Sequence, residues 1–193
     1  MKERKYYLWV DTETAGLLYD DFGKELPGEL MEVSAILTDE TLNPIFTKDW
    51  ICKWQDTMVD SMTNEIYELH SKNGLVNSSK QSNITPKIVD IELHQLIATN
   101  THGNAEIMLA GNSVAFDKEV IRRNLPRVFN LLYYRILDVS SIKELLLMVD
   151  PSIVYRAQGK KEYNHRALPD IKESIEEFRD YWIIFADVIS SYK

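Results

Sequence analysis

The first part of the chain has the hydrophobic pattern of a small antiparallel sheet. Residues 6–10 form an apolar run rich in residues that favour β-strands, and this run ends at the polar residues 11–14. A second apolar run covers residues 30–37, and a third covers residues 45–54 after the turn-forming pair Asn43-Pro44. Because consecutive strands with short connections pair side by side, these runs predict an antiparallel meander.

The rest of the chain alternates between helical and strand patterns. Thr85-Pro86 is typical of a helix start, because threonine caps a helix and proline is tolerated at its first position. Apolar residues at three- and four-residue steps, Trp182 among them, predict a buried stripe along a long last helix. The pattern predicts helices over residues 58–70, 85–98, 113–125, 140–149 (ended at Pro151) and 168–190, strands over 107–110 and 134–139, and a polar loop over 158–163.

This order of elements predicts a single α/β domain over residues 1–193, with a mixed sheet. A chain of 193 residues, 45% of them hydrophobic and 27% charged, buries a core without disulfides or structural metals. The net charge is 22 − 30 = −8, which disfavours tight, sequence-independent binding to duplex nucleic acid. Nucleic acid remains possible as a substrate, because a metal ion supplies positive charge locally.

Cysteine content and the terminal sequence bear on the compartment. Cys52 is the single cysteine, which excludes an internal disulfide and a cysteine-based zinc site and suits a reducing compartment. The charged residues 1–5 precede an apolar run too short for a signal peptide, and no run approaches the length of a membrane span. We therefore expect a soluble, cytoplasmic protein without a membrane partner.

Two carboxylates stand at the end of the first predicted strand. Asp11 and Glu13 are two residues apart, so their side chains point to the same face of the strand. Their mutual repulsion is costly unless a cation joins them, and ligands with oxygen donors favour hard ions such as Mg²⁺ or Mn²⁺. Taken alone, the pair fits a solvated strand end with two surface acids better than a metal site.

Three further residues complete a candidate site. Asp117 follows a strand-to-helix junction, His165 precedes the last helix, and Asp170 enters that helix. Each alone also fits an ordinary role: an acid near a helix N-terminus stabilises the helix dipole, and a loop histidine is often solvated. Together, four carboxylates and one histidine at element boundaries predict two-metal hydrolysis of a phosphodiester, with the histidine taking a proton from the attacking water.

These motifs resemble those of a known family, the DEDDh 3′-to-5′ exonucleases of the ribonuclease H-like superfamily. The resemblance is strongest to the oligoribonuclease branch and covers nearly the whole chain. It implies a mixed five-stranded sheet flanked by helices, two Mg²⁺ or Mn²⁺ ions per site, short single-stranded RNA or DNA substrates, nucleoside 5′-monophosphate products and a homodimer. The stretches that carry it are residues 9–17, 70–76, 111–117, 134–145 and 165–174.

The resemblance also implies roles for single residues. Asp11, Glu13, Asp117 and Asp170 would hold the metals, and His165 would be the general base. Residues outside the metal site would bind the substrate: Leu17 as an apolar wedge against the terminal bases, His70, Ser113 and Arg135 around the 5′ phosphate, and Tyr134 together with Arg135 from the partner subunit.

Two departures from the family pattern keep other functions open. Thr12, Thr14 and Ala15 are more typical of DNA-proofreading exonucleases, and Glu65 lies where a base-stacking tryptophan is expected. The loop over residues 18–29 is also longer than is usual in the family. The alternatives are a DNA-directed DEDDh exonuclease and a non-catalytic nucleic-acid-binding relative.

Overall fold

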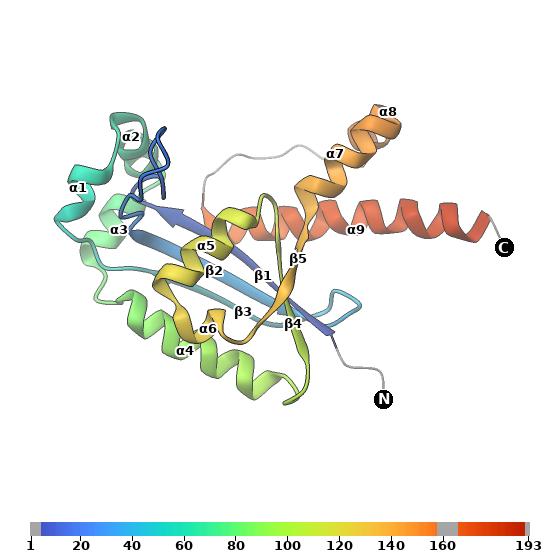
Figure 1. Cartoon of the computed structure of the whole chain (residues 1–193), viewed down its shortest axis with the longest axis horizontal. Helices are drawn as coiled ribbons and strands as arrows, with labels where there is room; N and C mark the ends of the chain where they lie inside the picture. Colours follow the sequence, from blue (N-terminus) through green and yellow to red (C-terminus); the bar gives the residue numbers. More distant parts are fainter. Residues whose placement is uncertain (1–4, 158–165, 192–193) are drawn as a thin grey trace.

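A five-stranded sheet lies at the centre of the structure, a computed structural model that describes residues 5–157 and 166–191 (Figure 1). The strands are β1 (Lys5–Thr14), β2 (Leu30–Thr38), β3 (Pro44–Ile51), β4 (Glu106–Gly111) and β5 (Leu132–Asp138). The helices are α1 (Thr57–Ser61), α2 (Asn64–Lys72), α3 (Leu75–Gln81), α4 (Pro86–Asn100), α5 (Ala115–Asn124), α6 (Pro126–Phe129), α7 (Val139–Val149), α8 (Pro151–Ala157) and α9 (Ala167–Ser191).

The sheet combines the two pairing modes that the sequence predicts. Its strand order is β3-β2-β1-β4-β5, with β1, β2 and β3 antiparallel and with β4 and β5 parallel to β1. The mixed five-stranded sheet flanked by helices and its antiparallel meander are therefore confirmed. Strand β1 lies in the middle of the sheet, paired with β2 and β4, and helices cover both faces of the sheet (Figure 1).

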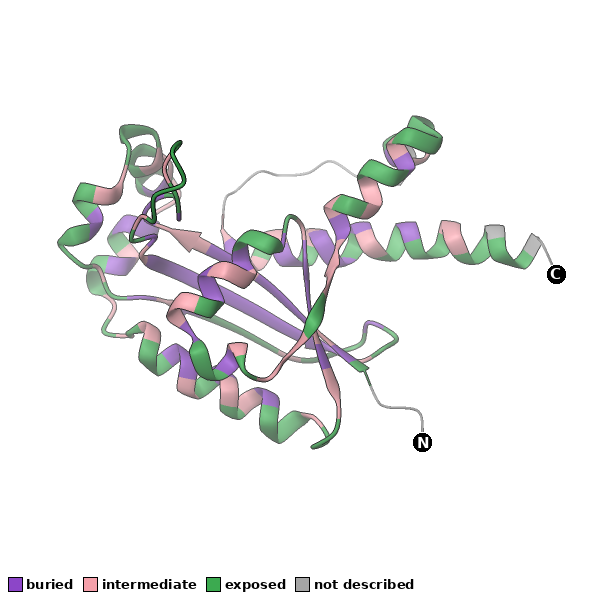
Figure 2. Cartoon of the chain, in the orientation of Figure 1, coloured by how far each residue is buried: buried purple, intermediate pink, exposed green. Residues whose placement is uncertain are grey.

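Side-chain alternation along β1 divides the core into two layers. Leu8 and Val10 pack in one cluster with residues of α4, α5 and α6, whereas Trp9 packs on the other face with residues of α7, α8 and α9. Figure 2 shows β1 and β2 as buried strands between these layers. Asp11 and Glu13 continue the face of Trp9, so they point toward the layer that contains α9.

A third cluster closes the sheet near the carboxyl end of β1. Ala15 and Met31 are fully buried there against Met58 of α1 and Leu75 of α3. This cluster packs α1 and α3 against the end of β1, and Figure 1 shows α1, α2 and α3 grouped beside the loop that leaves β1. The helical region after residue 55 is thus fixed next to the candidate site.

Helix boundaries differ from the sequence expectation at two places. The helix expected over 58–70 is two helices, α1 and α2, because Thr63 adopts an extended conformation and its side chain accepts a hydrogen bond from the Ile66 N–H as an N-cap. Pro151 ends α7 as expected but also begins α8, since proline is tolerated in the first turn of a helix. The short helices α3 and α6 were not expected.

The last helix is longer than the face it covers. Ile171 and Ile175 are buried against the sheet, but Trp182 is 61% exposed. Figure 1 shows α9 running past the edge of the sheet, where Trp182 packs against Phe178 with ring centroids 6.3 Å apart, so the apolar stripe is only partly buried in this half of the helix. Among the described residues, no helix is both long and apolar enough to cross a membrane. The loop expected over 158–163 lies outside the described residues.

Candidate active site

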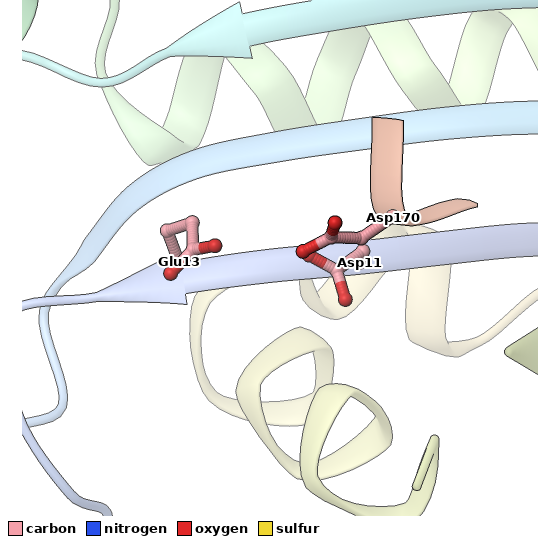
Figure 3. A group of neighbouring side chains, drawn as sticks. All are labelled: Asp11, Glu13 and Asp170. Carbon is pink, nitrogen blue, oxygen red and sulfur yellow. The ribbon is translucent and has the colours of Figure 1, made fainter. Parts of the chain in front are cut away.

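Three carboxylates from two distant segments meet at the carboxyl end of β1. Asp11 and Glu13 come from the strand, and Asp170 comes from the first turn of α9 (Figure 3). One oxygen from each carboxylate lies within 4.8 Å of the other two. The geometry follows from the fold, because Asp11 and Glu13 share the face of β1 on which α9 packs.

Burial and mutual repulsion oppose ionisation of these acids. Burial, together with the nearby carboxylates of Asp117 and Glu13, raises the pKa of Asp11 to about 9. Burial also raises the pKa of Glu13 to about 8, with Glu32 as the next cause. A bound divalent cation would reverse both effects, because it offsets the desolvation of the carboxylates and screens them from one another.

Asp117 approaches the site from the other face of the sheet. It lies in the first turn of α5, is buried, and accepts a hydrogen bond of 2.7 Å from the Thr12 hydroxyl. Burial raises the pKa of Asp117 to about 7, although the hydrogen bond from Thr12 lowers it. Asp117 is not one of the three mutually close carboxylates, but its charge acts on Asp11 and Glu13.

A buried ion pair lies directly beside the cluster. Glu32 of β2 is the register partner of Glu13 and is only 1% exposed. Arg166 donates hydrogen bonds of 2.7 to 3.0 Å to both carboxylate oxygens of Glu32, and the Ala167 N–H lies 3.4 Å from one of them. This contact fixes the residues that lead into α9, four positions before Asp170.

The turn after β4 is held by a polar network. Ser113 has a left-handed backbone (φ 50°), which is unfavourable for residues other than glycine. Its N–H donates to Asp138 at 3.0 Å and to the Ser140 hydroxyl at 2.9 Å. The Asn112 amide donates to Ser174 of α9 at 2.8 Å. The turn that precedes Asp117 is thereby tied to α7 and α9.

His70 of α2 lies next to the carboxylate cluster. It is buried, with Nε2 3.2 Å from the Thr14 carbonyl oxygen and 3.9 Å from a carboxylate oxygen of Glu13. His70 is expected from the family resemblance to bind the 5′ phosphate of a substrate, and the structure places it at the end of β1.

The other substrate-binding candidates lie on exposed surfaces. Leu17 is 59% exposed and lines a cavity of about 500 Å³ next to the end of β1. Tyr134 is 66% exposed on β5, which is an edge strand, and the Arg135 guanidinium lies 5.0 Å from its ring centroid. Ser113 is also exposed. Among the described residues, no hydrogen bond or ion pair joins Tyr134 or Arg135 to the carboxylates.

His165, the expected general base, lies outside the described residues. The structure adds two residues to the site for which the sequence suggested no role, Glu32 and Arg166, and it gives Thr12 a contact with Asp117. A signal for Glu32 was present, because it is a charged residue within an otherwise apolar strand pattern, and such residues need a partner when buried. Its partner could not be identified, because Arg166 is 134 residues away along the chain.

The donor set fits a hard divalent cation. It consists of carboxylate oxygens, which are the ligands preferred by Mg²⁺ and Mn²⁺. Their raised pKa values show that the ionised cluster is costly without a counter-charge. The residues present can therefore hold a divalent metal ion.

Comparison with known proteins identifies relatives over almost the whole chain. The family model RNase_T, described as an exonuclease, matches residues 8–178. A probable oligoribonuclease of Schizosaccharomyces pombe is 39% identical over 181 residues, which cover 91% of this chain and 68% of that protein. The oligoribonuclease of Mycobacterium leprae is 38% identical over 180 residues, which cover 90% of this chain and 78% of that protein.

Solved structures share the fold at low sequence identity. Escherichia coli Exonuclease I in complex with a dT13 oligonucleotide aligns with a TM-score of 0.60 and 18% identity, over 95% of this chain. The match spans less than half, 43%, of the Exonuclease I chain. The nuclease domain of 3′hExo, a DEDDh family member bound to rAMP, aligns with a TM-score of 0.55 and 11% identity, over 96% of this chain and 94% of that one.

Proposed function

The chain belongs to the RNase T exonuclease family and is a 3′-to-5′ exonuclease, and we propose that it hydrolyses short single-stranded oligonucleotides to nucleoside 5′-monophosphates with two divalent cations. The observation that carries the proposal is the convergence of Asp11, Glu13 and Asp170 from two distant segments. The names of the curated relatives, oligoribonucleases, support short RNA as the substrate class.

The proposed roles of the acids follow from their positions. Asp11, Glu13 and Asp170 would hold one Mg²⁺ or Mn²⁺, and Asp117, oriented by Thr12, would help to hold a second one near Asp11. When bound, such a pair of cations activates water and stabilises the charge that develops on the scissile phosphate. The protein's own contribution is to fix the carboxylates before the substrate arrives.

We further propose that His165 accepts the proton of the attacking water. A histidine has an ordinary pKa of ~6.5 and can therefore accept a proton near neutral pH. The next residue along the chain, Arg166, is held by Glu32, the register partner of Glu13, and this contact supports the proposed role. His165→Asn is expected to reduce kcat strongly while leaving the affinity for Mn²⁺ unchanged.

Substrate binding is proposed to involve two subunits. Leu17, His70 and Ser113 would bind the oligonucleotide in the subunit that cleaves it, and Tyr134 and Arg135 of the partner subunit would contact its 5′ phosphate. The exposure of Tyr134 and Arg135 on the edge strand β5 supports this role, since an arginine binds phosphate with two hydrogen bonds. Sedimentation with and without the substitution Tyr134→Ala tests the homodimer.

The proposed function is tested with 5′-end-labelled RNA and DNA oligomers of two to ten nucleotides, incubated with Mn²⁺ or with a chelator. Stepwise shortening from the 3′ end that requires Mn²⁺ and is fastest on the shortest RNA supports it. Asp170→Asn is expected to abolish shortening, and Asp187→Asn, a matched exposed change on the same helix, to retain it. Shortening by the Asp170→Asn variant at the wild-type rate would refute the assigned site.

The same experiment separates the alternatives. The exposed Glu65 on α2 offers no face for base stacking, which favours a DNA-directed exonuclease over a strict dinucleotide enzyme. Digestion of long DNA as fast as RNA dimers would establish that alternative. Binding of oligomers without any shortening would establish a non-catalytic relative.

A further inference from the structure

The loop between β1 and β2, residues 15–29, forms one wall of the cavity that contains Leu17. Leu17, Leu26 and Pro27 of this loop face Thr57, Asp60 and Ser61 of α1 across a volume of about 500 Å³. The loop begins and ends beside the carboxyl end of β1, where the Ala15 N–H donates a hydrogen bond to the Glu29 carbonyl oxygen at 2.8 Å. The cavity therefore lies next to the proposed metal-binding residues. Its size is within the usual range for small-molecule sites.

The opposite wall is fixed, because α1 touches the first motif directly. A Cβ atom built on Gly16 would lie 2.6 Å from the Ser61 carbonyl oxygen, so the two backbones are in close contact. Met58 of the same helix is fully buried under Ala15. The width of the cavity therefore depends on the position of the 15–29 loop.

The loop has little apolar anchoring beyond its first turn. Leu18 is buried, but Tyr19 and Phe22 are exposed, by 43% and 95%. Backbone hydrogen bonds join the two arms of the loop, from Leu26 N–H to the Leu18 carbonyl at 2.8 Å and from Asp20 N–H to the Lys24 carbonyl at 3.0 Å. These bonds shape the loop as a hairpin, yet they do not attach it to the rest of the protein.

Arg123 of α5 attaches the loop. Its Nη1 donates to the carbonyl oxygens of Leu26 at 3.0 Å and of Leu18 at 3.4 Å, one on each arm. Its guanidinium lies 4.8 Å from the ring centroid of Tyr19, and its Nε donates to Glu119 at 2.8 Å. The side chain is only 15% exposed, so these contacts are shielded from water.

Helix α5 also contains Asp117, six residues before Arg123. The same helix therefore sets the position of a metal-site carboxylate and of the loop wall that carries Leu17. Arg122, the residue before Arg123, binds the same Glu119 at 2.6 to 2.7 Å, but its side chain is 49% exposed and, within the described part of the chain, it donates no hydrogen bond to the 15–29 loop. The chain thus offers a matched pair of arginines.

We propose that Arg123 is a positioning residue for substrate binding: by holding both arms of the 15–29 loop it fixes the wall formed by Leu17, against which the terminal nucleoside of the oligonucleotide packs. The apolar side chains of Leu17, Leu26 and Pro27 provide a surface for a nucleobase. This inference rests on the proposed function. Arg123 acts through the loop and does not touch the reacting phosphate.

The test compares Arg123→Met with Arg122→Met in two assays. The first measures cleavage by endoproteinase Lys-C at Lys24, which is exposed at the tip of the loop. Arg123→Met is expected to speed this cleavage about tenfold, because loss of charged hydrogen bonds increases local opening. Arg122→Met is expected to be cleaved at the wild-type rate, and Arg123→Lys at an intermediate rate.

The second assay measures hydrolysis of an RNA trinucleotide. Arg123→Met is expected to raise KM about tenfold with kcat within about twofold, because it loosens binding and leaves the carboxylates in place. Leu17→Ala is expected to raise KM without faster Lys-C cleavage. The double variant Leu17→Ala/Arg123→Met is expected to have a KM no higher than that of the single variant with the higher KM, because both changes act on the same wall of the cavity.

Three results would overturn the inference. One is Lys-C cleavage of Arg123→Met at the wild-type rate, and another is an unchanged KM of this variant in an active enzyme. The third is a loss of kcat and of Mn²⁺ affinity instead of a rise in KM, which would indicate that Arg123 supports Asp117. If the wild-type protein hydrolyses no oligomer at all, the proposed function fails, while the Lys-C assay still decides whether Arg123 holds the loop.

Discussion

Two glutamates that face each other across β1 and β2 have opposite environments. Glu32 is buried to 1% exposure and receives hydrogen bonds from Arg166 on both carboxylate oxygens. Its register partner Glu13 lies with Asp11 and Asp170, and among the described residues no lysine or arginine forms an ion pair with Glu13 or Asp11.

The difference shows which buried carboxylates the protein pairs with a cation of its own and which it does not. Around Glu32 the chain supplies a guanidinium, so this carboxylate is a structural group with a fixed partner. Around Asp11 the chain supplies more carboxylates, and the pKa of Asp11 is raised to about 9 by burial and by those neighbours. A cluster that costs free energy in the isolated chain is suited to binding a cation from solution.

The largest expected effect comes from removing a carboxylate of the cluster formed by Asp11, Glu13 and Asp170. Asp11→Asn should reduce kcat/KM about 10³-fold, equivalent to ~4 kcal/mol, because a metal ligand contributes several kcal/mol to transition-state stabilisation. Without metal, the variant should nevertheless have a melting temperature equal to or above that of the metal-free wild-type protein, since one charge that repels Glu13 and Asp170 is gone. Kinetics with Mn²⁺ and melting in chelator test both points, and a strongly destabilised variant would contradict the comparison.

The next largest effect comes from breaking the ion pair between Arg166 and Glu32. Arg166→Met should lower the free energy of unfolding by about 3 kcal/mol, because it leaves Glu32 buried without a counter-charge. Urea unfolding measures this change. Glu32→Met/Arg166→Met should recover most of the lost stability, and a double variant as unstable as the single one would show that the arginine contributes through packing alone.

A smaller effect is expected at the hydrogen bond between Thr12 and Asp117. Thr12→Val keeps the shape of the side chain but removes the donor to the buried carboxylate. Affinity for Mn²⁺ should fall about tenfold, as is usual when a group that orients a metal ligand is lost. Calorimetric titration with Mn²⁺ measures it, with Thr57→Val as a control on an exposed threonine.

The smallest effect is on the pH dependence of stability without metal. Asp11 and Glu13 have raised pKa values in the folded protein, so they stabilise it most at pH values below their ordinary pKa. This stability is lost as pH rises through about 8 and 9. The melting temperature in chelator should fall by a few degrees between pH 6 and pH 9, and Mn²⁺ should remove the slope. A flat profile in chelator would refute the cost assigned to the cluster.

Much of the fold could be predicted from local pattern. The strands over 6–10, 30–37 and 107–110 and the helix beginning at Thr85-Pro86 lie where periodicity and capping place them. The split of the helix after residue 58 and the start of α8 at Pro151 were missed because threonine and proline signal both an end and a beginning. The exposure of Trp182 was missed because it depends on where the sheet ends.

The sequence by itself determined which groups are available for chemistry: carboxylates on one face of β1, an acid early in α5 and an acid early in α9. Only the tertiary structure decided which other residues lie next to these groups. Periodicity reports the face to which a side chain points, but it carries no information on which distant residue lies opposite. The pairing of Glu32 with Arg166, the approach of Asp170 to Asp11 and the attachment of the 15–29 loop by Arg123 are long-range contacts, so they exist only once the sheet and its two helical layers have assembled.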